Sequence, residues 1–75
     1  MKLTIIKDDN RVYIDGVSKI IDLSNLNPTY HAVQWYDTYG EIEIKNNQNK
    51  IIENRQIDNI DEFQIYIDLW YQTET

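Results

Sequence analysis

Few side chains in this sequence are of a type and spacing that could carry out chemistry. His31 is the only histidine, and the 75 residues contain no cysteine that could join it in a metal site. We therefore interpret His31 as a surface or packing residue. Glu41 and Glu43 alternate along one predicted strand, which places two carboxylates on one face, as an acid–base pair would require. Because no second domain forms a cleft around them, we interpret these carboxylates as the solvated side of a hairpin.

A second acidic stretch resembles a calcium-binding loop in part. It begins at Asp8-Asp9-Asn10 and ends at Asp15-Gly16, but Val12 and Tyr13 occupy positions that the loop needs for an oxygen ligand and a glycine. No phosphate-binding loop, dinucleotide-binding motif or nucleophile elbow is present. The sequence therefore predicts no cofactor, no metal and no catalysis.

The segment around His31 is predicted to be the central β-hairpin of the fold. Residues 31–45 alternate apolar and polar side chains on both sides of Asp37-Thr38-Tyr39-Gly40. Asp at the first and Gly at the fourth position favour a type I turn closed by a left-handed glycine. We therefore expect a positive φ at Gly40.

Strands are predicted on both sides of this hairpin. Asp15-Gly16 is typical of a type I′ turn, and Asn27-Pro28 interrupts strand structure. The expected strands span residues 2–7, 11–15 and 17–23 before the hairpin, and 50–56, at an edge, after it.

The C-terminal segment changes to a helical period. Ile60, Phe63, Ile67 and Trp70 recur at three- and four-residue spacing, which predicts an amphipathic helix over residues 60–71. Asn59 and Glu62 are predicted to form a capping box. No Lys or Arg follows in the last turn, so we expect fraying after Tyr71. The fold class is therefore α+β: one domain, residues 1–75, with a small antiparallel β meander of four to six strands and one C-terminal helix packed on a sheet face.

The charge distribution restricts the classes of partner. The formal net charge is −6, of which residues 58–75 carry −5 and the first 57 residues carry −1. Binding to nucleic acid or to an anionic membrane needs clustered Lys and Arg, so neither is predicted as a partner. No signal-like or membrane-spanning apolar run is present, which predicts a soluble protein located in the cell that makes it.

Two surfaces are candidates for binding a protein partner. The first is an exposed aromatic group around the central turn, and the second is the polar side of the acidic helix. The predicted partner-binding residues are Tyr30, Tyr36 and Tyr39 in the first group and Asp61, Glu62 and Asp68 in the second.

Short motifs along residues 12–43 carry a resemblance to a known group of proteins. They are Asp15-Gly16, Asp22-Leu23-Ser24, His31-Ala32-Val33-Gln34-Trp35 and Gly40-Glu41-Ile42-Glu43. In this order they resemble a pattern in small proteins encoded by tailed bacteriophages and prophages, with a looser match at Phe63 and Leu69-Trp70. The resemblance implies a phage origin and a structural, assembly or host-interaction role. It implies no assigned activity.

Two functions remain open at this point. The first is a non-catalytic, phage-encoded protein-interaction module with a virion-accessory, tail-associated or assembly role. The second is an anti-defence or host-takeover inhibitor whose acidic face occludes a basic site on a host protein. Both place the protein in the cytoplasm of the bacterial host, with the virion as a further location for the first, and both leave homo-oligomers open. A small hydrolase or metal enzyme is the least favoured interpretation.

Overall fold

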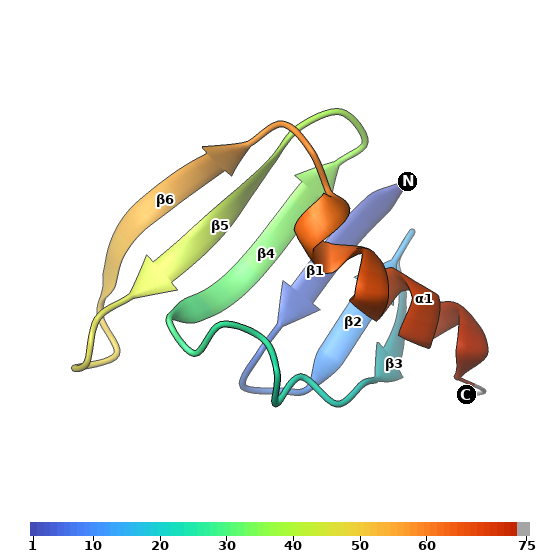
Figure 1. The fold of residues 1–75 in the computed structure, drawn as a ribbon, viewed down its shortest axis with the longest axis horizontal. Coiled ribbons are helices and arrows are strands. Elements are labelled where there is room, and N and C mark those ends of the chain that lie inside the picture. Colours follow the sequence, from blue (N-terminus) through green and yellow to red (C-terminus); the bar gives the residue numbers. More distant parts are fainter. Residues whose placement is uncertain (74–75) are drawn as a thin grey trace.

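A computed structural model describes residues 1–73 as one antiparallel sheet with a helix on one side (Figure 1). Six strands lie in the order β3-β2-β1-β4-β5-β6. The elements are β1 (Lys2–Ile6), β2 (Arg11–Ile14), β3 (Val17–Ile20), β4 (Tyr30–Tyr36), β5 (Gly40–Lys45), β6 (Ile51–Ile57), the 3₁₀ turn η1 (Asp61–Phe63) and α1 (Gln64–Gln72). This arrangement confirms the predicted α+β class and the predicted position of the last strand at an edge.

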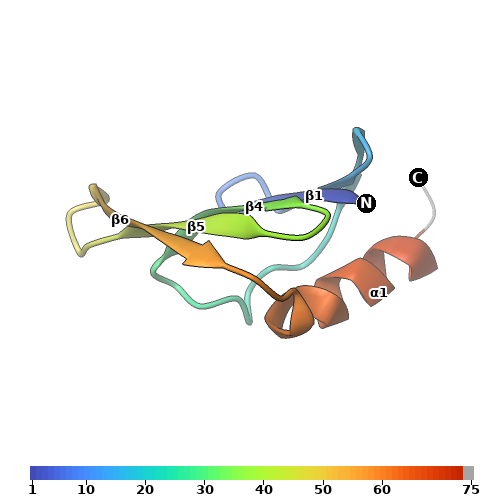
Figure 2. The ribbon, with the colours of Figure 1, turned by 90° about the horizontal axis from the view of Figure 1, so that it is seen from above.

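The sheet consists of two three-stranded meanders joined through its centre. Strand β1 pairs with both β2 and β4, so the first strand lies in the middle of the sheet. The link between β3 and β4 therefore passes beneath the sheet on the side of the helix (Figure 2). Its residues Ile21, Leu23 and Leu26 are buried in the core. For this reason β3 ends at Ile20, and the prediction of a strand up to residue 23 was wrong at that end.

The first two hairpins have the turn geometry that their turn residues predict. Asp15 and Gly16 have φ values of 50° and 87°, as the two central residues of a type I′ turn require. The Asn10 N–H donates to the Lys7 carbonyl at 3.1 Å, and Asn10 has a φ of 50°. Polar residues that tolerate left-handed backbone thus close both turns.

The central hairpin has the expected position but a different turn. The Tyr36 N–H donates to the Tyr39 carbonyl at 2.7 Å, and Asp37 is the residue with a positive φ, at 79°. Gly40 lies in strand β5 and has no positive φ, so that prediction was wrong. Glycine is required there for space: a Cβ would lie 3.0 Å from the Trp35 ring and closer still to the Gln34 carbonyl oxygen.

The core lies between the helix side of the sheet and the layer formed by α1 and the β3–β4 link. Alternate strand residues point into it, with Leu3, Ile5, Val12 and Val33 completely buried. The helix contributes Phe63, Tyr66 and Ile67 as buried residues, while Trp70 is only partly buried. Phe63 and Ile67 were predicted in this role.

The start of the helix differs from the prediction. The chain enters through the 3₁₀ turn η1, and no side-chain hydrogen bond caps either η1 or α1. Asn59 still accepts a bond from the Asp61 N–H at 3.3 Å, but Glu62 does not complete a capping box. The tight first turn brings Phe63 into the core directly after β6.

The end of the helix is held from outside. Lys19 Nζ, on β3, donates to the Trp70 and Thr73 carbonyls at 2.9 and 2.6 Å, and lies 4.0 Å from the Trp70 ring centroid. The cation missing from the last turn is therefore supplied by a strand distant in sequence. The α-helix continues to Gln72, past the predicted fraying point at Tyr71.

Candidate functional site

The sheet has one face that neither the helix nor the β3–β4 link covers (Figure 2). We call this the open face. Because side chains alternate along a strand, it carries the residues that lie between the buried ones. The register aligns them in rows across the sheet: Ser18, Tyr13, Thr4, Gln34, Glu41 and Gln56 in one row, and Ile20, Arg11, Ile6, Ala32, Glu43 and Asn54 in the next.

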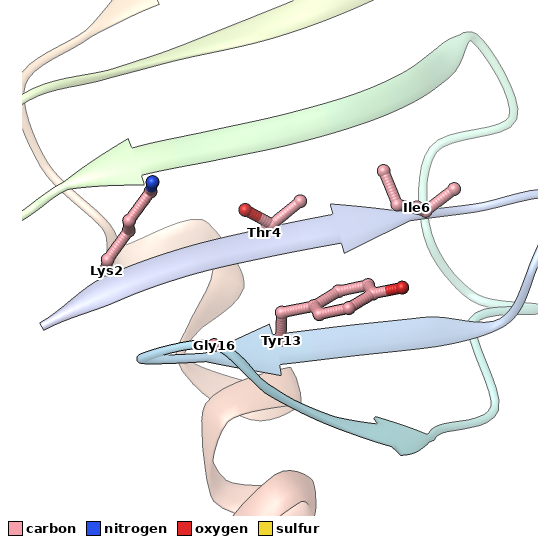
Figure 3. Close-up of a pocket in the computed structure, with 5 residues that line it drawn as sticks. All are labelled: Lys2, Thr4, Ile6, Tyr13 and Gly16. Atoms are coloured by element: carbon pink, nitrogen blue, oxygen red, sulfur yellow. The ribbon is translucent and has the colours of Figure 1, made fainter.

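A shallow depression lies on the β1–β2 half of the open face (Figure 3). It has a volume of about 280 Å³ and is lined by Lys2, Thr4, Ile6, Tyr13 and Gly16. The Tyr13 ring lies along the depression, and no heavy atom is within 4 Å of the place where a Cβ of Gly16 would be. The lining offers an aromatic ring, a methyl-rich floor, a hydroxyl and an ammonium group, which suits it to receive a side chain from a partner.

The second feature is a tyrosine pair at the end of the same face. The rings of Tyr36 and Tyr39 lie 5.3 Å apart between centroids, and 37% and 48% of the two residues are exposed. The Tyr36 hydroxyl donates to Gln34 Oε1 at 2.9 Å, which fixes one ring relative to the row that contains Tyr13. The predicted aromatic group therefore exists at these two positions.

The adjoining turn is held by the chain terminus. The Met1 ammonium group donates to Asp37 Oδ1 at 2.9 Å, and this hydrogen bond raises the pKa of the amine. A further hollow is lined by Met1, Lys2, Asp15, Tyr36 and Asp37. The tyrosine pair thus stands beside a polar rim rather than on an isolated loop.

Tyr30 is not part of this surface. It is only 5% exposed, and its ring lies 6.1 Å from that of Phe63 in the core. Burial raises the pKa of its phenol. Regular alternation would place Tyr30 on the open face together with Tyr36, but the ladder between β4 and β5 is irregular between Tyr30 and Ala32. The extra residue, His31, turns Tyr30 to the helix side, so its assignment to the binding surface was wrong.

Tyr13 takes the place of Tyr30 as the third tyrosine of the open face. It was not predicted as a site residue, although the alternation of Val12 and Ile14 already placed it on the opposite side of its strand. Its pairing with Thr4 and Ser18 brings it onto the open face.

The acidic group lies on the other side of the molecule. Asp61, Glu62 and Asp68 are exposed on η1 and α1, which pack against the covered face of the sheet (Figure 1). Asp68 accepts a hydrogen bond from Gln64 Nε2 at 3.0 Å. The structure therefore brings Tyr36 and Tyr39 together, and it separates them from the three acids.

His31 has two charged neighbours at the surface. Its Nδ1 lies 3.8 Å from Asp8 Oδ2, and Lys45 Nζ lies 3.7 Å from Asp8 Oδ1. Within residues 1–73, no three His, Cys, Asp or Glu side chains are grouped so that they could hold a metal ion. His31 thus lies beside the Asp8–Lys45 ion pair, with 38% of its side chain exposed, in agreement with its interpretation as a surface residue.

Comparisons with protein families, with curated protein sequences and with solved structures gave no match. None of the helices in the described part of the chain has the length and apolar character needed to cross a membrane.

Proposed function

We propose that this chain is a non-catalytic protein-interaction module encoded by a tailed bacteriophage, with a virion-accessory, tail-associated or assembly role. Its protein partner, from the phage or its host, binds to the open face. One observation supports this most strongly: the face of the sheet that residues 1–73 leave uncovered carries three tyrosines, Tyr13, Tyr36 and Tyr39. Tyrosine is enriched at protein interfaces and at their energetic hot spots.

One contact on the open face restricts a tyrosine. The Tyr36 hydroxyl is hydrogen-bonded to Gln34 Oε1, in the row that also contains Thr4 and Tyr13. A side chain held in this way loses less rotamer freedom on binding, so less of the interaction free energy is spent on ordering it.

Positive and negative side chains lie on different halves of the open face. Lys2 and Arg11 lie on the β1–β2 half, whereas Glu41 and Glu43 lie on β5. A partner with the opposite charge pattern is favoured in one orientation and disfavoured when turned around. Specificity in this proposal comes from the charges, and affinity comes from the tyrosines.

The test is a set of matched tyrosine variants. Wild-type protein is used to recover its partner from phage-infected cells, and binding of that partner is then measured with Tyr13→Ser, Tyr36→Ser and the control Tyr71→Ser. Tyr71 is 65% exposed on the helix, so the same chemical change is made away from the open face. We expect the two open-face variants to weaken binding by tenfold or more, about 1.4 kcal/mol, and the control to leave it unchanged.

The inhibitor function is the alternative, and a specific observation favours it. In the described part of the chain, none of Asp61, Glu62 and Asp68 takes part in an ion pair. Their charge is therefore available to a basic site on a host protein. If this function is correct, reversing the three acids to Lys abolishes binding, salt weakens it, and the Tyr13 and Tyr36 variants bind as wild type does. That result would refute the open-face proposal.

A further inference from the structure

The two edges of the sheet differ in how they are protected. At one edge, β3 is four residues long, and Trp70 Nε1 donates to the Val17 carbonyl at 3.1 Å. At the other edge, β6 is seven residues long, and no element of residues 1–73 lies beside it (Figure 1). All its residues except the half-buried Ile57 are exposed, including 62% of Ile52. The β5–β6 ladder shifts register between Ile44 and Lys45, so the regular part of β6 is residues 53–57. An exposed edge strand of this kind is a template for adding another strand.

The hydrogen-bond pattern shows which backbone groups of β6 are free. The bond from the Tyr36 N–H to the Tyr39 carbonyl directs Tyr39 toward β4. Backbone direction alternates along a strand, so Ile42 is directed toward β6 and its partner Arg55 toward β5. The bond from the Asn46 N–H to the Lys50 carbonyl agrees with this alternation. The N–H and C=O groups of Asn54 and Gln56 therefore point to the free edge, whereas the β5–β6 ladder shifts register next to Ile52.

The sequence of β6 is complementary to itself when reversed. Glu53 and Arg55 lie on either side of Asn54, with their side chains on the same face of the strand. In an antiparallel pair centred on Asn54, Glu53 of one copy is opposite Arg55 of the other, and the same pair occurs again by symmetry.

We propose that β6 pairs with β6 of a second copy of this chain, around a two-fold axis at Asn54. The free N–H and C=O groups of Asn54 in the two copies then exchange a pair of backbone hydrogen bonds across the axis, and Gln56 extends the pairing on either side. The two sheets become one continuous sheet with both helices on the same side, and the open face extends across both copies. This inference does not depend on the proposed function.

The charges of Glu53 and Arg55 favour this register over the two registers that are shifted by one residue. Shifting the two-fold axis by one residue places Glu53 opposite Glu53 or Arg55 opposite Arg55, and like charges directly opposite each other are destabilising. Within one copy, Arg55 Nε already donates to Glu53 Oε2 at 3.1 Å. The dimer therefore joins two such ion pairs into a group of four charges with alternating sign.

The experiment is a charge exchange read by the mass of the protein in solution. Sedimentation equilibrium of the full chain, over a wide range of concentration, should give a mass approaching twice the monomer's 9.0 kDa. Glu53→Arg alone gives four positive charges at the interface, and Arg55→Glu alone gives four negative charges. We expect each single variant to weaken self-association by about tenfold or more. An equal mixture of the two variants should recover the dimer, because every opposed pair then has opposite sign.

Two controls keep the test specific. Glu41→Arg makes the same charge change as Glu53→Arg but lies on the open face, so its dimer should persist. Asn54→Pro removes an N–H that the monomer fold does not use, so it should abolish the dimer while thermal unfolding stays near that of wild type. Salt is not used as the readout, since each copy has a net charge of −6 and salt also screens the repulsion between copies.

Three results would overturn the inference. The first is a wild-type protein that stays monomeric at all concentrations. The second is a dimer that persists in Asn54→Pro, which would place the contact on another surface. The third is a mixture of the two single variants that fails to associate although each variant is folded by circular dichroism.

Discussion

Replacing Lys19 with methionine tests how the helix is held on the sheet. The lysine ammonium group bonds the Trp70 and Thr73 carbonyls at 2.9 and 2.6 Å and lies over the Trp70 ring. Methionine retains an apolar stem against that ring but removes the charge and both bonds. The variant therefore isolates the contribution of the ammonium group.

The expected loss follows from these contacts. Hydrogen bonds to a charged group are worth about 1.5–3 kcal/mol each, and a cation–π contact adds about 0.5–1 kcal/mol at an exposed site. Lys19 is only partly buried, so water replaces much of what is lost. We expect a loss of about 1–2 kcal/mol in the free energy of unfolding. For a domain of this size, that corresponds to a fall in Tm of about 5–15 °C.

The assay is urea unfolding followed by tryptophan fluorescence, with amide hydrogen exchange at the end of α1. Lys50→Met is the matched control, because Lys50 is exposed in the loop before β6. We expect a lower midpoint with an unchanged slope for Lys19→Met, and faster exchange at Thr73, whose N–H donates to the Trp70 carbonyl. A midpoint and an exchange rate equal to those of the control would refute the role given to Lys19.

Three further predictions concern the core and the turns. Phe63→Ala should cost about 3–5 kcal/mol in thermal unfolding, because the side chain is completely enclosed; an unmoved Tm would mean that the helix is not docked through it. Gly16→Asn should be nearly neutral, because asparagine tolerates left-handed backbone and the space around Gly16 is open. Gly40→Asn should be clearly destabilising, because its Cβ would collide with Gln34 and Trp35; equal effects would refute this distinction. In an alkaline absorbance titration of the folded protein, Tyr30 and Tyr66 should ionise after the other tyrosines, because burial raises the pKa of both. The two protonated phenols stabilise the fold fully at any pH below their pKa in the unfolded chain, and this stabilisation is lost as the pH rises through their pKa in the folded protein. Tyr30→Phe should therefore remove part of the loss of stability at alkaline pH.

The parts of the fold that local chemistry determines could be predicted from the sequence. The Asp15-Gly16 turn needs only two adjacent residues with positive φ, and the period of the C-terminal segment identifies Phe63 and Ile67 as buried. The position of β1 between β2 and β4 could not be predicted in this way. It depends on the β3–β4 link burying its own apolar residues beneath the sheet, which is a property of the packed molecule.

In the candidate site, too, the residues determined by local sequence could be predicted and those determined by packing could not. Tyr13 and Tyr36 follow from alternation, because Tyr13 lies between the buried Val12 and Ile14 and Tyr36 follows the buried Trp35. Tyr30 does not, because one extra residue in β4 reverses the face of everything before it, and no turn residue marks the irregularity. The role of Lys19 could not be predicted for another reason. Its positive charge compensates the negative C-terminal end of helix α1, which begins more than forty residues later.

The sizes of the two layers determine how much of the sheet the helix covers. A helix of nine residues is about 14 Å long, whereas six strands with a spacing of about 4.8 Å span about 24 Å. The helix therefore covers the half of the sheet that contains β1 to β3 and leaves β6 free on its edge (Figure 1). The residues at the two uncovered places differ in kind, with tyrosines on the open face and opposite charges at the edge. In the two proposals the open face binds through tyrosine rings and the β6 edge pairs through opposed charges, so Tyr13→Ser should leave the mass in solution unchanged. A dimer that also depends on Tyr13 would show that the copies meet face to face and would contradict the proposed edge pairing.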